Sequence, residues 1–302
     1  MKKITLFFTA TLVSGILFAQ NVLTDQESIK EMNSIHPKDH FPNKVVQKYP
    51  SLREADVMWS RTIWREIDLR EKINHTFYYP ENDGVGHTIN DRRSLIDVIY
   101  QAVLDGELTA YGNAAMDDEF KEELSDAEVK KIGGAKEELI EVIDWDAVAE
   151  GADPEDAKIT RLNKVAFNRN SVKKWRIKEI WYFDKQRSVM GVRIVGLCPL
   201  QEGKDEVTGR LDGTWNPLFW VRFQEARKVL VNAEVFNLMK NDAERRTYDD
   251  IFWKRMFNST IVKEANVMDR KISEYMIGLD GLLEAERIKA EIFNIEHDLW
   301  EY

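Results

Sequence analysis

The stretch that decides the fold begins Val172-Lys-Lys-Trp175-Arg-Ile177-Lys-Glu-Ile180-Trp181-Tyr182-Phe183 and continues, after a polar turn, as Val189-Met-Gly-Val192-Arg-Ile194-Val195-Gly-Leu197-Cys198. A Gly-rich loop then leads to Leu218-Phe-Trp220-Val221-Arg-Phe223. Each run is rich in β-branched and aromatic residues and is bounded by turn-forming residues, which is typical of strands. The pattern therefore predicts an antiparallel meander of three strands that forms the core.

The limits of these strands follow from the residues that flank them. Residues 184–188 are polar and are expected to form the hairpin turn, and Pro199 is expected to end the second strand because it lacks a backbone donor. Residues 201–216 contain three glycines and are expected to form a loop. Apolar side chains at both odd and even positions of 218–223 indicate a strand that is covered on both faces.

Length and composition restrict the class of protein. The chain has 302 residues, of which 43% are hydrophobic, so it can form one large domain or two modest ones. Its formal net charge of −10 argues against nucleic-acid binding, which usually relies on a positive surface. Cys198 is the only cysteine, so no intramolecular disulfide forms, and we expect its thiol to be buried as a small apolar group.

The first residues have the pattern of an export signal. Lys2 and Lys3 give a positive start, an apolar run follows up to Phe18, and Ala19 supplies the small residue before the expected cut. The apolar run is short for a membrane span. We therefore predict a signal peptide at 1–19 and an exported, soluble protein that has no membrane span.

Residues 20–52 carry no helical or alternating pattern and contain Pro37, Pro42 and Pro50. Each proline removes a donor and restricts the residue before it, so this range is predicted to be an extended N-terminal arm. Residues 53–302 are predicted to form a single α+β core domain, in which helices pack against the meander.

Two helices are expected before the meander. Trp59, Ile63 and Ile67 recur every four residues, which favours a helix over 53–73. Residues 94–105 have a broad apolar face, with Asn90 or Asp91 as the cap and Asp105-Gly106 at the end. Residues 108–111 are expected to be a short extended piece.

Three helices are expected after the meander, at 226–239, from Asp249 onward, and at 282–299. The last has an apolar stripe at steps of three and four residues, formed by Leu282, Ala285, Ile288, Ile292, Ile295 and Leu299. This stripe is expected to pack within the chain, the alternative being another subunit. The helices 53–73, 94–105 and 282–299 are the predicted cover of the sheet.

Residues 117–158 differ from the rest in charge, with 16 acidic and 5 basic residues. Gly133-Gly134, Gly151 and Pro154 interrupt any pattern there, and no calcium-loop motif is present. We predict a flexible acidic insertion, within which residues 138–145 form one short element.

The sequence contains few residues whose spacing suggests a catalytic, cofactor-binding or metal-binding site. His36 and His40 have a spacing that suits a metal on a helix, but Pro37 lies between them and no further ligand completes the set. Gly84 and Gly86 lack the third glycine and the strand of a dinucleotide loop. We predict no catalytic, cofactor-binding or metal-binding residues.

An ordered set of strings resembles one known family. The strings are Trp59-Ser-Arg-Thr-Ile-Trp64-Arg-Glu-Ile-Asp-Leu-Arg-Glu-Lys72, Ser94-Leu-Ile-Asp-Val-Ile-Tyr100, Lys178-Glu-Ile-Trp181-Tyr-Phe-Asp-Lys185, Arg193-Ile-Val-Gly-Leu-Cys-Pro199, Glu225-Ala-Arg-Lys-Val-Leu230 and Glu296-His-Asp-Leu-Trp-Glu-Tyr302. Together they resemble GldN, also called PorN, of the Bacteroidetes type IX secretion system. The resemblance covers most of 53–112 and 161–302.

The resemblance implies a periplasmic structural component of the secretion and gliding machinery. It implies self-association in a ring with a GldK or PorK lipoprotein at the inner face of the outer membrane, and work with the motor proteins GldL and GldM. It supplies no catalytic residues or cofactor. From the residues themselves, we assign Phe293, Trp300 and Tyr302 to a partner interface, because Phe293 and Trp300 lie seven apart and off the main stripe.

Two other functions stay open. A periplasmic module that binds a peptide or small ligand would have a large apolar cleft. An exported hydrolase would place His75 or His87 in a deep pocket beside a carboxylate and a nucleophile.

Overall fold

The computed structural model describes residues 44–81, 92–112, 118–134, 136–143, 158–165, 167–204, 210–236 and 245–298. The chain separates into two compact units, Met1–Lys44 and Val45–Tyr302, and every described residue except Lys44 belongs to the second. The predicted signal peptide, His36, His40 and His87 lie outside the described residues. Residues 44–53 form neither helix nor strand.

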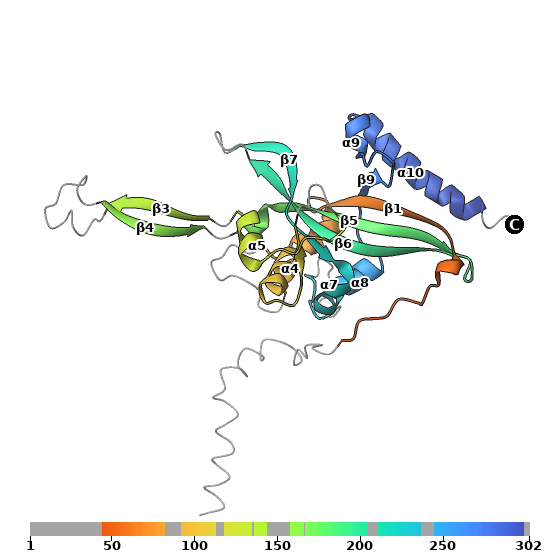
Figure 1. Ribbon diagram of the computed structural model, residues 1–302, viewed down its shortest axis with the longest axis horizontal. Helices are drawn as coiled ribbons and strands as arrows, with labels where there is room; N and C mark the ends of the chain where they lie inside the picture. The colour runs from red at the N-terminus through yellow and green to blue at the C-terminus, as the bar shows by residue number, and fades with distance from the viewer. Residues whose placement is uncertain are drawn as a thin grey trace, which may run out of the picture. The chain divides into compact units, whose positions relative to one another are not determined.

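The second unit is built on a large antiparallel sheet (Figure 1). Its strands are β1 Val57–Asp68, β2 Ala110–Tyr111, β5 Val172–Asp184, β6 Val189–Lys204, β7 Leu211–Pro217, β8 Trp220–Arg222 and β9 Thr260–Glu264. The order is β2-β8-β6-β5-β1-β9, and β7 pairs with the far end of β6. The predicted α+β class and the antiparallel neighbours β5, β6 and β8 are confirmed.

The long hairpin β5–β6 forms as the sequence indicates, with one correction. Ser188 closes the turn with a φ of 52°. Pro199, however, does not end β6: it lies opposite Trp175, and its carbonyl accepts a hydrogen bond from the Leu218 amide at 3.0 Å. Proline removes only its own donor, so β6 continues to Lys204 and pairs with β7, where a loop was expected.

The predicted helix 53–73 is wrong, because residues 57–68 form strand β1 in the interior of the sheet. β1 pairs with β5 over its whole length and with β9 on its other edge. A spacing of four residues fits the period of a helix, but it is also an even number and therefore keeps side chains on one face of a strand. Only short 3-10 turns, η1 Glu54–Asp56 and η2 Lys72–Asn74, flank the strand.

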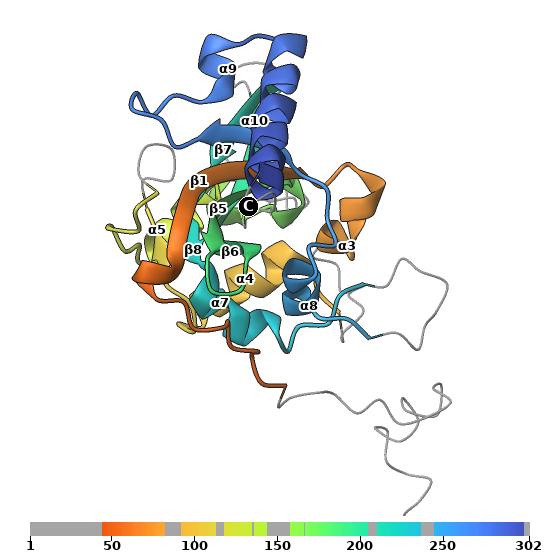
Figure 2. The same ribbon diagram turned by 90° about the vertical axis from the view of Figure 1, so that its right-hand side faces the viewer.

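The helices vary in length from four to twenty residues. They are α3 His75–Tyr78, α4 Leu95–Leu104, α5 Asp126–Ile132, α7 Phe223–Leu230, α8 Tyr248–Trp253, α9 Ile272–Tyr275 and α10 Leu279–Asp298, with a 3-10 turn η3 Arg169–Ser171. In Figures 1 and 2, α4, α7 and α8 lie below the sheet, whereas α10 lies above β1 beside β9. The predicted helix 226–239 begins earlier, at Phe223, and ends at Leu230. It ends there because the backbone of Val235 and Glu234 forms hydrogen bonds with the segment before α8.

Helix α4 has the predicted position but a different cap. The Ser94 hydroxyl accepts a hydrogen bond from the Asp97 amide at 3.4 Å and donates to the Asp97 carboxylate at 2.7 Å. The expected caps Asn90 and Asp91 lie outside the described residues. Gly106 closes the helix with a φ of 74°, as predicted.

The acidic range 117–158 contains regular structure. Helix α5 begins at a capping box in which Ser125 and Glu128 satisfy each other's backbone amides. Strand β3 Lys136–Ile143 then pairs with β4 Lys158–Val165 as a separate two-stranded sheet. The short element expected at 138–145 is the end of β3, and the flexibility of the range stays a prediction.

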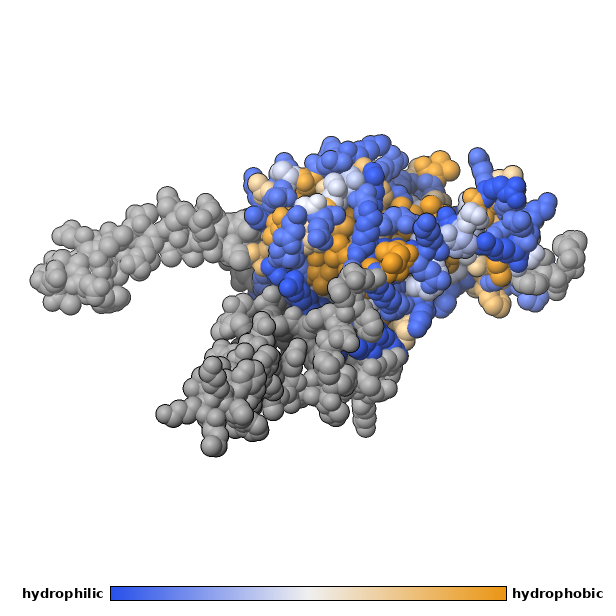
Figure 3. Space-filling view, turned by 90° about the horizontal axis from the view of Figure 1, so that it is seen from below, coloured by the Kyte–Doolittle hydropathy of each residue, from blue (hydrophilic) through white to orange (hydrophobic). Residues whose placement is uncertain are grey.

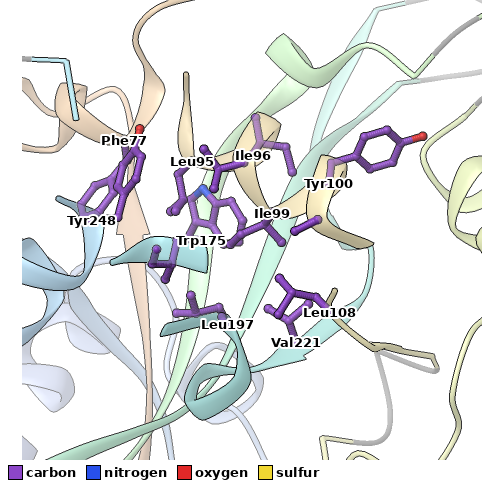
Figure 4. Close-up of a cluster of buried hydrophobic side chains, with 14 of the residues drawn as sticks. Phe77, Leu95, Ile96, Ile99, Tyr100, Leu108, Trp175, Leu197, Val221 and Tyr248 are labelled. Atoms are coloured by element: carbon purple, nitrogen blue, oxygen red, sulfur yellow. The ribbon is translucent and has the colours of Figure 1, made fainter. Parts of the chain in front are cut away.

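The main core lies between the sheet and helices α4, α7 and α8. Figure 4 shows Leu95, Ile96 and Ile99 of α4 around Trp175 of β5, which is 1% exposed. Leu197 of β6 and Val221 of β8 line the same cluster. The surface on the side of these helices is a mixture of hydrophilic side chains and smaller apolar areas (Figure 3). Cys198 is buried, as expected, and burial raises the pKa of its thiol to about 12.

Candidate interaction surfaces

A second, smaller core attaches α10 to the sheet. Ala285, Ile288 and Ile292 of α10 pack with Ile63 of β1 and Ile261 of β9. These three helix residues belong to the predicted apolar stripe, so its packing within the chain is confirmed for them. Ile295 is half-buried and Leu299 lies outside the described residues.

Charged contacts at the edge of this core fix the helix against the sheet. Arg61 of β1 lies 3.1 Å from the carboxylate of Glu291 on α10 and 2.8 Å from that of Glu264 on β9. Burial raises the pKa of Glu264, an effect that Arg61 opposes and the nearby Glu291 reinforces. Arg61 thus joins β1, β9 and α10 at one point.

A buried polar contact separates the two cores. Glu179 of β5 is fully buried, and Arg255 donates to both of its carboxylate oxygens at 2.9 and 3.1 Å. The Trp181 indole donates to the same carboxylate at 3.1 Å. Two guanidinium bonds and one indole bond compensate the desolvation of Glu179, so the contact is structural.

Exposed large apolar side chains are concentrated in the segment that contains α9 and α10. Of the large apolar residues exposed in the described part of the chain, nine lie between 267 and 293, namely Val267, Met268, Tyr275, Met276, Ile277, Leu279, Leu282, Leu283 and Phe293. We call these nine residues the C-terminal apolar surface. Leu279, Leu283 and Phe293 are separated by four and ten residues, which places them on one side of the helix, away from the buried stripe. Exposed apolar side chains gathered on one side of a helix are typical of interaction sites.

The predicted interface residues are only partly described. Phe293 is 66% exposed and lies on this surface, whereas Trp300 and Tyr302 lie outside the described residues. Leu282 was expected in the buried stripe and is instead 57% exposed, because the start of α10 lies beside α9 and beyond the edge of the sheet (Figure 2). Leu279 and Leu283 were missed, although two consecutive leucines at 282 and 283 are more than one buried stripe can accommodate.

Described residues line at least two cavities. One, of 330 Å³, lies between α4 and α7 and is lined largely by polar groups such as Arg93, Asp105 and Lys228. The other, of 420 Å³, lies over β1, β5 and β6 and is lined mainly by apolar groups. We call the second the sheet cleft. His75 lines neither cavity and packs edge-on against Tyr79, 5.5 Å between ring centres.

Within the described ranges, no group of three or more His, Cys, Asp or Glu side chains could hold a metal ion. In the same ranges, no helix is both long and apolar enough to cross a membrane.

Comparison with known proteins identifies a family. Residues 52–301 match the family described as "Gliding motility associated protein GldN". The matched range includes the whole sheet, both cores and all of α10. No curated protein matches the chain.

Proposed function

The chain belongs to the GldN family and is a component of the gliding motility and type IX secretion machinery, and from this we propose that it is a non-enzymatic structural subunit of a periplasmic ring. In this proposal the protein lies at the inner face of the outer membrane. It associates with further copies of itself and with a lipoprotein of the GldK or PorK kind. Motor proteins of the GldL and GldM kind are its further partners.

The C-terminal apolar surface is the single observation that carries the proposal. A ring subunit must present surfaces that its own fold does not bury, and the fully buried centre of an interface is more apolar than the rest of the surface. Leu279, Leu282 and Leu283 meet this description, because they are exposed although the same helix buries Ile288. We assign Phe293, Trp300 and Tyr302 to the same interface.

The test compares two leucines of equal exposure. Leu282 on α10 and Leu211 on β7 are each 57% exposed, so Leu282→Asp and Leu211→Asp make the same change at matched sites. We expect the wild-type protein and L211D to migrate in a high-mass complex with the lipoprotein when envelopes are solubilised gently. L282D is expected to be largely lost from that complex. A wild-type protein recovered only as a free monomer would contradict the proposal.

A photocrosslinking amino acid can test the interface directly. Placed at position 293, it should yield adducts with the lipoprotein or with a second copy of the chain, identified by mass spectrometry. Placed at position 211, it should not. Equal crosslinking at both positions would reject the assignment of Phe293.

A peptide-binding or ligand-binding module is the second candidate function. The observation that favours it is the sheet cleft, whose volume and apolar lining are in the range of small-ligand sites. A ring subunit can also carry such a cleft, so the two functions are compatible.

A further inference from the structure

The sheet cleft lies over β1, β5 and β6, and the first turn of α7 borders it at Gln224. Ile180 and Tyr182 of β5 alternate with Trp181, which packs against the small core beneath α10, so they lie on the other face of the strand. The cleft is lined by Leu52, Val57, Ser60, Phe120, Ile180, Tyr182, Arg193, Ile194, Val195, Arg222 and Gln224. Its floor is continuous across three strands, because Ser60 pairs with Tyr182 and Ile180 pairs with Arg193.

The charge of the cleft is opposite to that of the chain. Its lining contains two arginines and neither aspartate nor glutamate, whereas the chain as a whole has a formal charge of −10. The remaining lining groups are apolar or neutral. An apolar floor with two guanidinium groups is complementary to an apolar ligand that carries a carboxylate.

Arg193 is held in place but lacks an anionic partner. Its guanidinium lies 5.4 Å from the ring centres of both Tyr49 and Tyr182, and its Nη2 donates to the Pro50 carbonyl at 2.8 Å. Its Nε is buried and makes no hydrogen bond, and no carboxylate of the described residues lies within 4.0 Å of the group. A half-buried cation without a counter-charge is costly, so the arrangement is preorganised for an anion.

Arg222 lies at the other end of the cleft. Its guanidinium is 4.7 Å from the Tyr111 ring centre, and its Nη2 donates to the Phe120 carbonyl at 3.3 Å. The nearest carboxylate, Glu225, is 3.8 Å away, which is longer than a hydrogen bond. Arg222 therefore keeps donors available for a ligand.

The neutral polar groups of the lining distinguish a peptide from a simple fatty acid. Ser60, Tyr182 and Gln224 place two hydroxyls and an amide along the same floor. Main-chain amides of a peptide can use these groups, whereas a fatty acid has only its carboxylate to offer. We propose that the sheet cleft binds a short apolar peptide segment whose acidic side chain or terminal carboxylate pairs with Arg193 and Arg222.

A library of random octapeptides displayed on phage, selected against the full chain, supplies the probe. We expect enriched sequences to combine apolar residues with at least one Asp or Glu. A synthetic peptide of the strongest sequence should lose about tenfold in affinity when its acid is changed to the amide. A library that yields no enriched peptide, or enriched peptides without an acid, overturns the proposal.

Arginine variants locate the binding site. Arg222→Gln should weaken the selected peptide about tenfold, and Arg193→Gln should do the same. Arg187 is the matched control, since it is 46% exposed like Arg222 and also lies 3.8 Å from a carboxylate three residues away. R187Q should bind as the wild type does. Equal binding by R222Q and R187Q would overturn the site.

Two further measurements separate the outcomes. Decanoic acid, added as a competitor, should displace the bound peptide only weakly. If decanoic acid displaced the peptide at a concentration equal to that of the peptide, the cleft would be a site for amphiphilic acids and the peptide proposal would be overturned. The high-mass envelope complex should persist in R222Q. Loss of peptide binding without loss of the complex therefore separates this site from the ring interface on α10.

Discussion

Helices α4 and α10 use apolar residues in opposite ways. Helix α4 has ten residues and buries eight of them, whereas α10 has twenty residues and buries only three. Part of the difference lies in composition, because α4 has one charged residue, Asp97, whereas charged residues fill many of the positions of α10 that do not face the sheet. The rest lies in what covers each helix: α4 is enclosed by the sheet and by α7, whereas α10 meets the sheet along one stripe only.

This difference between the helices predicts which residue changes affect stability and which affect association. Residues that surround α4 contribute to one large core, so a change there affects the unfolding of the whole unit. Residues on the outward side of α10 are in water in the isolated chain, so a change there affects only what the helix contacts in an assembly. The following predictions test this division, beginning with the largest effect.

Two arginine–carboxylate pairs give the sharpest contrast in stability. Arg227 of α7 donates to both oxygens of Asp249 at 2.6 and 3.0 Å, and both side chains are buried. Arg227→Met leaves a buried, unpaired carboxylate and should lower the free energy of unfolding by about 3–5 kcal/mol. Arg287→Met breaks the pair with Glu284 on the exposed side of α10 and should cost at most about 1 kcal/mol. Urea denaturation measures both.

Matched isoleucines test the same division with apolar groups. Ile99 of α4 is 0% exposed and Ile288 of α10 is 1% exposed. Ile99→Ala should cost about 4 kcal/mol and Ile288→Ala about 2 kcal/mol, because the smaller core around α10 can relax into the space. Equal costs with a single cooperative transition would show that α10 belongs fully to the main core.

The sequence already distinguishes these helices in part. The broad apolar face at 95–103 predicts the enclosure of α4, and the stripe at 285, 288 and 292 predicts the contact of α10. It does not show where the sheet stops beneath α10, because that depends on β9, which pairs with β1 across nearly 200 residues. Leu282 was misplaced for this reason.

Strand β1 was missed for a related reason. Its charged residues resemble the polar side of a helix, yet Glu66 pairs with Arg176 at 2.7 Å across the neighbouring strand. That partner lies 110 residues away, so local periodicity cannot reveal it. The β-branched and aromatic residues of 57–67 were the available signal for a strand. The sheet cleft was missed as well, because its lining comes from several distant segments.

A third prediction concerns pH and the buried thiol of the sheet. Below pH 9, Cys198 is protonated in the folded and the unfolded chain. The folded pKa is about 12 against an ordinary 9.0, so between these values the unfolded chain loses the proton first. The free energy of unfolding should then fall by about 1.4 kcal/mol per pH unit. Cys198→Val should have a shallower dependence between pH 9 and 10.5, measured by urea denaturation. Parallel curves for the two proteins would contradict the burial of the thiol.

The smallest expected effect concerns the attachment of α10. Glu291→Gln removes the charge that Arg61 contacts at 3.1 Å, but Arg61 keeps Glu264 at 2.8 Å, so the global stability should change by only about 0.5 kcal/mol. Because α10 buries one stripe, the loss should appear as local opening. Hydrogen exchange should become faster in 285–292 and stay unchanged in 95–104. Glu286→Gln, whose carboxylate lies 3.3 Å from Lys289 on the exposed side, is the control and should leave both segments unchanged. Faster exchange in both segments of E291Q would mean that α4 and α10 open together, and the division between them would fail.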